Sequence, residues 1–246
     1  ERLADLKAVT LDRTRQFYRD FYGGAHAELV LAGDFEPADV EKQVAELATG
    51  WTSPQPYAEL QRPYQAIPAA HEALETPDKP NAMFTAGLRM PLSDEDPDYP
   101  ALVLSNYLLG STASSRLYAR IRGKEGLSYG VGSQLQPQPQ EANAQWLAFA
   151  IAAPQNVAKV EKAFREEIDR ALKDGFTAEE IAAGKSGWLQ GQQVSRSQDP
   201  ELVRRLRALA HHGRTMAFEA ELEKKVQALT AEQILAALRR HLDPAR

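Results

Sequence analysis

The feature that most limits the fold of this chain is a change of hydrophobic period near residue 155. Before that point, residues 82–90 beside a proline-containing turn predict a strand, and apolar residues alternate along 127–135 and 145–152, which is typical of half-buried strands. The last two runs flank a polar, proline-bearing loop at 136–143 and predict a hairpin. Beyond residue 155 the apolar spacing is helical, so helices are expected to follow the strands.

Start signals fix two of the predicted helices. Thr177 with Glu180, and Thr230 with Gln233, match the capping-box pattern, in which each side chain bonds the other residue's backbone N–H. The helices predicted in the second half of the chain are 155–173, 177–194, 199–212, 216–229 and 230–242, and two earlier ones are predicted over 99–109 and 114–122.

The first 50 residues predict a helix, a strand and a second helix. Thr10 is placed as the N-cap of the first helix, which ends at a pair of glycines. An apolar run over 27–32 has the length of a strand, and a second helix is predicted from Pro37 to about Thr49.

A proline-rich stretch separates this unit from the strands further on. Residues 52–70 contain four prolines and no lasting period, which indicates a linker. After it the pattern changes, and a short strand is predicted over 73–76 ahead of the one at 82–90. We therefore expect two parts of the chain to meet near this stretch.

Composition removes several classes of function. The 246 residues include no cysteine, which excludes disulfides, thiolate metal sites and a cysteine nucleophile. The net charge of −5 gives no reason to expect binding to nucleic acid or to an anionic membrane. No apolar run approaches the roughly 20 residues that span a bilayer. Such a chain suits either a bacterial cytoplasm or a periplasm, and its opening residues suggest a piece of a longer protein.

No zinc-ligand motif is present. No two histidines stand four residues apart, so neither H-E-x-x-H nor the inverted H-x-x-E-H occurs. His71 opens a similar string, but Glu75 takes the place of the second histidine, in a predicted strand where such ligands would not converge. The histidines of the chain are His26, His71, His211, His212 and His241, and the pair 211–212 ends a predicted helix, where histidine usually complements the helix dipole.

The segment 110–133 holds the candidate functional residues. A short predicted helix carries Arg122 into a Gly-Lys-Glu-Gly turn, and the strand that follows carries Tyr129 seven residues later. A guanidinium offers a fork of donors that suits peptide carbonyl oxygens, and a phenol can donate to an oxyanion as it forms. On spacing alone, the favoured interpretation is an exposed arginine and a half-buried strand tyrosine without a function.

This segment resembles the signature of the C-terminal half of insulinase/pitrilysin-type zinc peptidases, close to S-x-L-[YF]-x-x-[IL]-R-x-x-x-G-L-[AS]-Y. The matching residues are Ser115, Leu117, Tyr118, Ile121, Arg122, Gly126, Leu127, Ser128 and Tyr129. A second landmark of the family, an apolar strand that ends the first domain with Gly-Asp, resembles residues 30–34, and the helix before it matches 10–22. The resemblance thus covers nearly the whole chain.

The resemblance implies an α+β fold, with a mixed, mostly antiparallel sheet covered by helices on one side. It implies that residues 1–51 are the tail of a first peptidase-like domain, that 52–70 are a linker, and that 71–246 form a second domain without zinc. In the family, two such halves enclose a chamber.

The resemblance also implies a division of roles. The N-terminal half of the family carries zinc on the inverted motif, where the glutamate activates water. The C-terminal half supplies an arginine and a tyrosine, here Arg122 and Tyr129, that hold the substrate backbone and support the tetrahedral oxyanion. The chain is therefore expected to bind a peptide substrate and to need a zinc-bearing half or homologous subunit. It is expected to hold no cofactor itself and to be inactive alone. The alternative is a non-catalytic interaction or scaffold protein of the same fold.

An internal similarity suggests a duplicated domain. Residues 7–13 resemble 227–233, with Thr10 and Thr230 standing 220 positions apart. The first copy leads into the apolar run at 27–33, whereas the second reaches residue 246 where that strand should begin. We therefore hypothesise that 27–33 completes the sheet of the second domain, within one chain or by exchange between two chains in a strand-swapped dimer. A structure in which this segment pairs with no strand of that sheet would contradict the hypothesis.

Overall fold

A computed structural model describes residues 2–139 and 141–244 and divides the chain into two units. Unit 1 is Glu1–Gln61 with Ser195–Thr215, and unit 2 is Arg62–Val194 with Met216–Arg246. The elements are, in chain order, α1 (Arg2–Lys7), α2 (Leu11–Phe21), η1 (Gly24–His26), α3 (Pro37–Ala48), β1 (Ala82–Met90), α4 (Tyr99–Asn106), η2 (Tyr107–Ser111), η3 (Tyr118–Lys124), β2 (Ser128–Gln138), β3 (Glu141–Ala152), η4 (Pro154–Asn156), α5 (Val157–Asp174), α6 (Ala178–Arg196), α7 (Asp199–His211), α8 (Met216–Ala228) and α9 (Ala231–His241). No described helix is both long enough and apolar enough to cross a bilayer.

Unit 1 confirms the two helices predicted near the start of the chain but not the strand between them. Thr10 caps α2, and its hydroxyl accepts a hydrogen bond from the N–H of Arg13 at 3.3 Å. Residues 27–32 form no strand, and Leu29 and Leu31 are 59% and 46% exposed. The strand prediction was wrong because a lone extended segment has no neighbour to satisfy its backbone groups.

Unit 2 contains a three-stranded antiparallel sheet in the order β1-β3-β2. The prediction of β1 is confirmed at both ends, and the hairpin of β2 and β3 is longer, with a shorter loop, than the sequence suggested. An isolated parallel bridge joins Ser93 to Gln138. The strand predicted over 73–76 is absent, because that segment has no ladder partner among the described residues. Among the described residues, segment 27–33 pairs with no strand of the sheet either, which is the outcome that contradicts the hypothesis that this segment completes the sheet.

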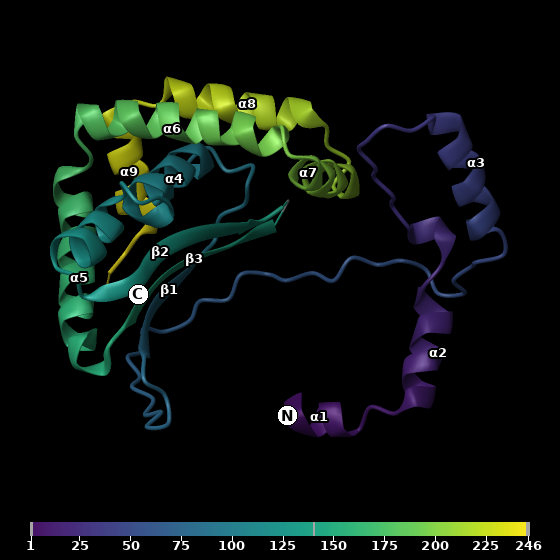
Figure 1. Ribbon diagram of the computed structural model, residues 1–246, viewed down its shortest axis with the longest axis horizontal. Coiled ribbons are helices and arrows are strands. Elements are labelled where there is room, and N and C mark those ends of the chain that lie inside the picture. The colour runs from purple at the N-terminus through teal and green to yellow at the C-terminus, as the bar shows by residue number, and fades with distance from the viewer. Residues whose placement is uncertain (1, 140, 245–246) are drawn as a thin grey trace. The chain divides into compact units, whose positions relative to one another are not determined.

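The helices of unit 2 gather on one side of the sheet, as Figure 1 shows, and the α+β prediction is confirmed. One face of β3 is buried and consists mainly of alanines, which let the helices approach closely. The buried side chains of that face are Ala144, Trp146, Ala148, Ala150 and Ala152. The predicted capping box of Thr230 and Gln233 forms at the start of α9, and that of Thr177 and Glu180 forms at the start of α6.

Helix α6 approaches the α4–η2 segment through a glycine. A Cβ atom at Gly184 would lie 2.5 Å from Cδ2 and 3.1 Å from Cγ of Leu108, which is itself buried. Gly191, two turns further along the same helix, has no atom within 4 Å of where its Cβ would be. Both glycines thus lie within the same helix, but a side chain at Gly184 would meet Leu108, whereas one at Gly191 would meet no other atom within 4 Å.

Alanine at these two positions should therefore have opposite effects on stability. Gly191→Ala should raise the free energy of unfolding by about 0.5–1 kcal/mol, because alanine is the better helix former. Gly184→Ala should lower it by about 0.5–2 kcal/mol, because the added methyl group must displace Leu108. Chemical denaturation of both variants measures the difference, and equal gains at the two positions would contradict the close approach.

A partly buried ion pair joins the segment before η3 to the start of α6. Arg116 is 9% exposed, and its Nε and Nη2 atoms each donate to Glu180 at 2.7 Å. The hydrogen bonds from the Arg116 guanidinium, supported by one from the backbone N–H of Thr177, outweigh the effect of partial burial and lower the pKa of Glu180 from 4.5 to about 2. The charged form of Glu180 is therefore favoured in the folded state.

This pair should contribute to stability above about pH 4.5, the ordinary pKa of the glutamate, and lose its effect as the pH falls toward about 2. Glu180→Gln should lower the free energy of unfolding at pH 7 by about 1–3 kcal/mol and flatten the acid side of the stability profile. Glu179→Gln, on the exposed side of the same turn, is the matched control and should cost less than about 0.5 kcal/mol. Denaturation between pH 2 and 7 tests both, and an unaltered acid limb in Glu180→Gln would refute the assignment.

Candidate functional site

The candidate site is built on a helix–turn–strand segment that is anchored by buried side chains. Leu117, Ile121 and Leu127 are 0%, 1% and 9% exposed. They belong to a second hydrophobic cluster whose other buried members are Ala150, Ala152, Val160 and Ala163, contributed by β3 and α5. The apolar residues of the signature therefore fix the segment to the sheet and to α5, and leave the remaining residues for other roles.

The helix of this segment is a π-helix rather than the α-helix that the sequence suggested. Residues 118–124 form η3, and the turn closes with hydrogen bonds from Glu125 N to Arg120 O at 3.1 Å and from Leu127 N to Ile121 O at 2.9 Å. Gly126 has φ +61°, which is left-handed backbone that glycine adopts without strain. Single π-helical turns are rare and occur frequently at functional sites.

A β-bulge places Tyr129. Ser128 lies opposite Ala152 and Gly130 lies opposite Ile151, so Tyr129 is an extra residue without a partner on β3. The Ser128 hydroxyl lies 2.7 Å from the carbonyl oxygens of both Gly130 and Ile151 and can donate to either, which holds the bulge in place. A bulge re-aims the side chain that it carries. Tyr129 is accordingly 81% exposed at the start of an otherwise half-buried strand.

The two predicted site residues lie together. The guanidinium carbon of Arg122 is 5.8 Å from the ring centre of Tyr129, although one comes from η3 and the other from β2. The same carbon is 5.1 Å from the ring centre of Tyr118, one helical turn earlier. The structure thus brings an exposed guanidinium and an exposed phenol to one surface, with a second aromatic ring beside them.

Arg122 differs from the two other arginines of this segment. Arg116 is paired with Glu180, and Arg120 is paired with Glu125 and with Glu166, the latter at 2.7 Å. Within residues 2–139 and 141–244, the side chain of Arg122 makes no ion pair or hydrogen bond and contacts aromatic rings instead. Two arginines therefore hold the segment to its surroundings, and the third keeps its donors available.

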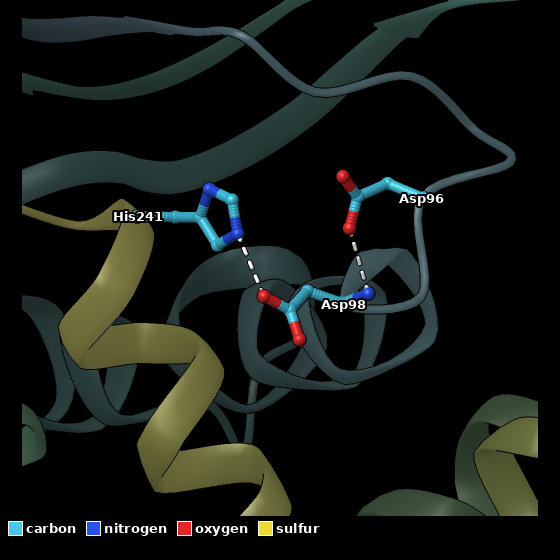
Figure 2. A group of neighbouring side chains, drawn as sticks. All are labelled: Asp96, Asp98 and His241. Atoms are coloured by element: carbon cyan, nitrogen blue, oxygen red, sulfur yellow. Dashed lines mark hydrogen bonds and ion pairs between the residues drawn. The ribbon is translucent and has the colours of Figure 1, made fainter.

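Figure 2 shows the carboxylates of Asp96 and Asp98 beside the ring of His241, a group whose donor atoms lie within 4.8 Å of one another. Asp98 accepts hydrogen bonds from His241 at 2.8 Å and from Arg240, and Asp96 accepts one from the backbone N–H of Asp98 at 2.8 Å. Burial would raise the pKa of Asp98, but the bonds from His241 and Arg240 outweigh it and lower that pKa. With a guanidinium already on its carboxylate, the group ties α9 to the start of α4 and does not suit a cation.

The other histidines make no zinc site either. His71 is 73% exposed and lies 3.5 Å from Glu161. Its segment is irregular rather than the predicted strand, so the string of residues 71–75 gives no helical pair of ligands. His211 is the last residue of α7, which ends one residue earlier than predicted, and lies 3.6 Å from Glu28 and 3.8 Å from Glu59. These groups of described residues therefore do not offer the ligands of a zinc site. The zinc that the family resemblance implies would be held by residues of the other half.

Sequence reasoning missed two contacts. Tyr118 was noted only as a match to the signature, although its distance of four residues from Arg122 in a predicted helix was a usable signal of contact. The hydrogen bond between Asp98 and His241 joins residues 143 positions apart, and no local sequence pattern predicts it.

Comparisons with known proteins show the family of the chain. The sequence profile described as the Peptidase M16 inactive domain matches residues 8–187. An uncharacterized zinc protease of Streptomyces coelicolor is 31% identical over 196 residues, which make up 77% of this chain and 41% of that protein. The chain thus spans about two fifths of the length of this curated relative.

Two solved structures share the fold. The peptidase M16 inactive domain from Pseudomonas fluorescens superposes with a TM-score of 0.71 at 23% identity, covering 96% of this chain and 56% of that one. A protease from Helicobacter pylori gives a TM-score of 0.83 at 16% identity, covering 98% of this chain and 58% of that one. Because the profile matches well over half of the sequence, the chain belongs to the peptidase M16 family, as its inactive domain.

Proposed function

We propose that this chain is the substrate-binding half of an M16 zinc peptidase, and that Arg122 and Tyr129 act on the peptide that a zinc-bearing half cleaves. The observation that carries the proposal is the state of Arg122. Its donors are unused by any described residue, and the exposed phenol of Tyr129 lies beside it. Arg116 and Arg120, which are paired with carboxylates on the same segment, supply structural contacts, so none is needed from Arg122.

The two side chains have complementary roles in this proposal. The guanidinium of Arg122 donates from two N–H groups to a carbonyl oxygen of the substrate backbone, a geometry that suits its planar fork. The phenol of Tyr129 donates to the oxygen that gains negative charge in the tetrahedral intermediate, which it stabilises more than the ground state. Neither role needs a metal ligand from this chain, and in the one candidate cluster among the described residues Asp98 is already bonded by Arg240.

Residues 1–51 are proposed to be the tail of the first peptidase-like domain and to dock on the zinc-bearing half. The support is the aromatic face of α2, where Phe17, Tyr18 and Phe21 are 56%, 52% and 49% exposed and no residue is buried. Exposed aromatic patches of this kind mark interaction surfaces.

The roles of Arg122 and Tyr129 are tested by hydrolysis of a quenched fluorescent peptide with this chain and a zinc-bearing M16 half together. Tyr129→Phe should reduce kcat by about 10–1000-fold, because it removes one oxyanion donor. Arg122→Ala should reduce kcat/KM by a similar factor, because a charge-assisted contact to the substrate is lost.

Lys124→Ala is the matched control, because it removes an exposed cation from the same helix and should leave the rate within about twofold. Each half alone, with zinc added, should give no hydrolysis. Cleavage that survives both Arg122→Ala and Tyr129→Phe would refute the proposed roles and favour the alternative of a non-catalytic scaffold with the same fold. Cleavage by this chain alone would refute the need for a second half.

A further inference from the structure

The side chain of Arg122 lies near two aromatic rings that reach it from different elements. Its guanidinium carbon is 5.1 Å from the ring centre of Tyr118, on η3, and 5.8 Å from that of Tyr129, on β2. Guanidinium groups are attracted to aromatic faces within about 6 Å of the ring centre. Both contacts fall in this range, and the contact with Tyr118 is the shorter.

Tyr118 is the better fixed of the two rings. Its neighbours Leu117 and Ile121 are 0% and 1% exposed, and Tyr118 itself is half-buried, so its backbone belongs to the anchored part of the segment. Tyr129 is 81% exposed and stands on a bulge. An exposed ring on a bulge is free to follow a ligand, whereas a ring on an anchored helix can serve as a fixed support.

We infer that Tyr118 is a positioning residue for Arg122, an assignment that rests on the proposed function of Arg122. A guanidinium over a ring keeps the N–H groups in its own plane available, whereas a carboxylate partner would occupy them. Arg116 and Arg120 have such carboxylate partners, which in each case take the Nε and one terminal N–H group of the guanidinium. The aromatic support orients Arg122 and leaves its donors for the carbonyl oxygen of a peptide.

The support itself can be measured on this chain without a partner or a substrate. The Nε–Hε group of Arg122, assigned by its disappearance in Arg122→Lys, should resonate upfield of an unrestrained arginine, because aromatic ring currents shield it. Tyr118→Phe keeps a ring and should keep the shift. Tyr118→Leu removes the ring and should move the resonance toward the value of an unrestrained arginine. Thermal unfolding of each variant checks that the fold is retained.

A double-mutant cycle tests whether the support matters for peptide hydrolysis, using the chain with a zinc-bearing half and the quenched peptide. Tyr118→Leu should lower kcat/KM by about 2–30-fold, the range that corresponds to one cation–π contact. In the Arg122→Ala background the same change should have no further effect, because Tyr118 acts through Arg122. Tyr118→Phe should behave as the unmodified chain.

If Tyr118→Leu impairs folding, replacement of Tyr118 by pentafluorophenylalanine keeps the shape of a ring and weakens its attraction for a cation. This replacement should reproduce the kinetic loss.

An unaltered Arg122 resonance without the Tyr118 ring, or an equal loss with and without Arg122, overturns the inference and leaves the proposed function standing. An Arg122→Ala variant with full activity overturns the proposed function instead. The shift of the Arg122 resonance then still shows whether the Tyr118 ring supports the guanidinium.

Discussion

The burial of Leu117, Ile121 and Leu127 against β3 and α5 is the interaction on which the candidate site depends. It anchors a segment that departs from regular structure twice, through the π-helix η3 and the bulge at Tyr129. Such departures cost hydrogen bonds or strain and persist only where the surroundings over-determine the backbone. The apolar residues of the signature supply that constraint, and the two irregularities place Arg122 and Tyr129 on one surface.

The electrostatics of the same segment follow a simple division. Arg116 is buried, so its charge must be paired, and Glu180 and the carbonyl oxygen of Gly175 pair it. Arg120 joins the turn to α5 through carboxylates. Once these two tie the segment down, an unpaired third guanidinium adds nothing to its anchoring. The proposed function gives the donors of Arg122 a ligand, which is consistent with the absence of an ion-pair or hydrogen-bond partner among the described residues.

Local signals in the sequence predicted the parts of the fold that local physics determines. Thr10, Thr177 and Thr230 each cap a helix as predicted, because capping needs only residues three positions apart. The strand at 27–32 failed because a strand needs a partner that sequence pattern cannot supply. The motif predicted that Arg122 and Tyr129 belong together, but the bulge that turns Tyr129 outward depends on the register with β3, which no spacing reveals.

The stability of unit 1 also points to a need for a partner. Helix α2 has 11 residues, buries none of them and exposes its aromatic side chains. Helices of this length are marginal in water and gain most of their stability from packing an apolar face. A partner that covers these rings would therefore stabilise α2 by mass action, and the order of unit 1 would depend on its concentration. Unit 2 has its own hydrophobic core and does not depend on a partner in this way. In the proposed function, association with a zinc-bearing half would therefore stabilise unit 1 and bring the zinc to the candidate site of unit 2.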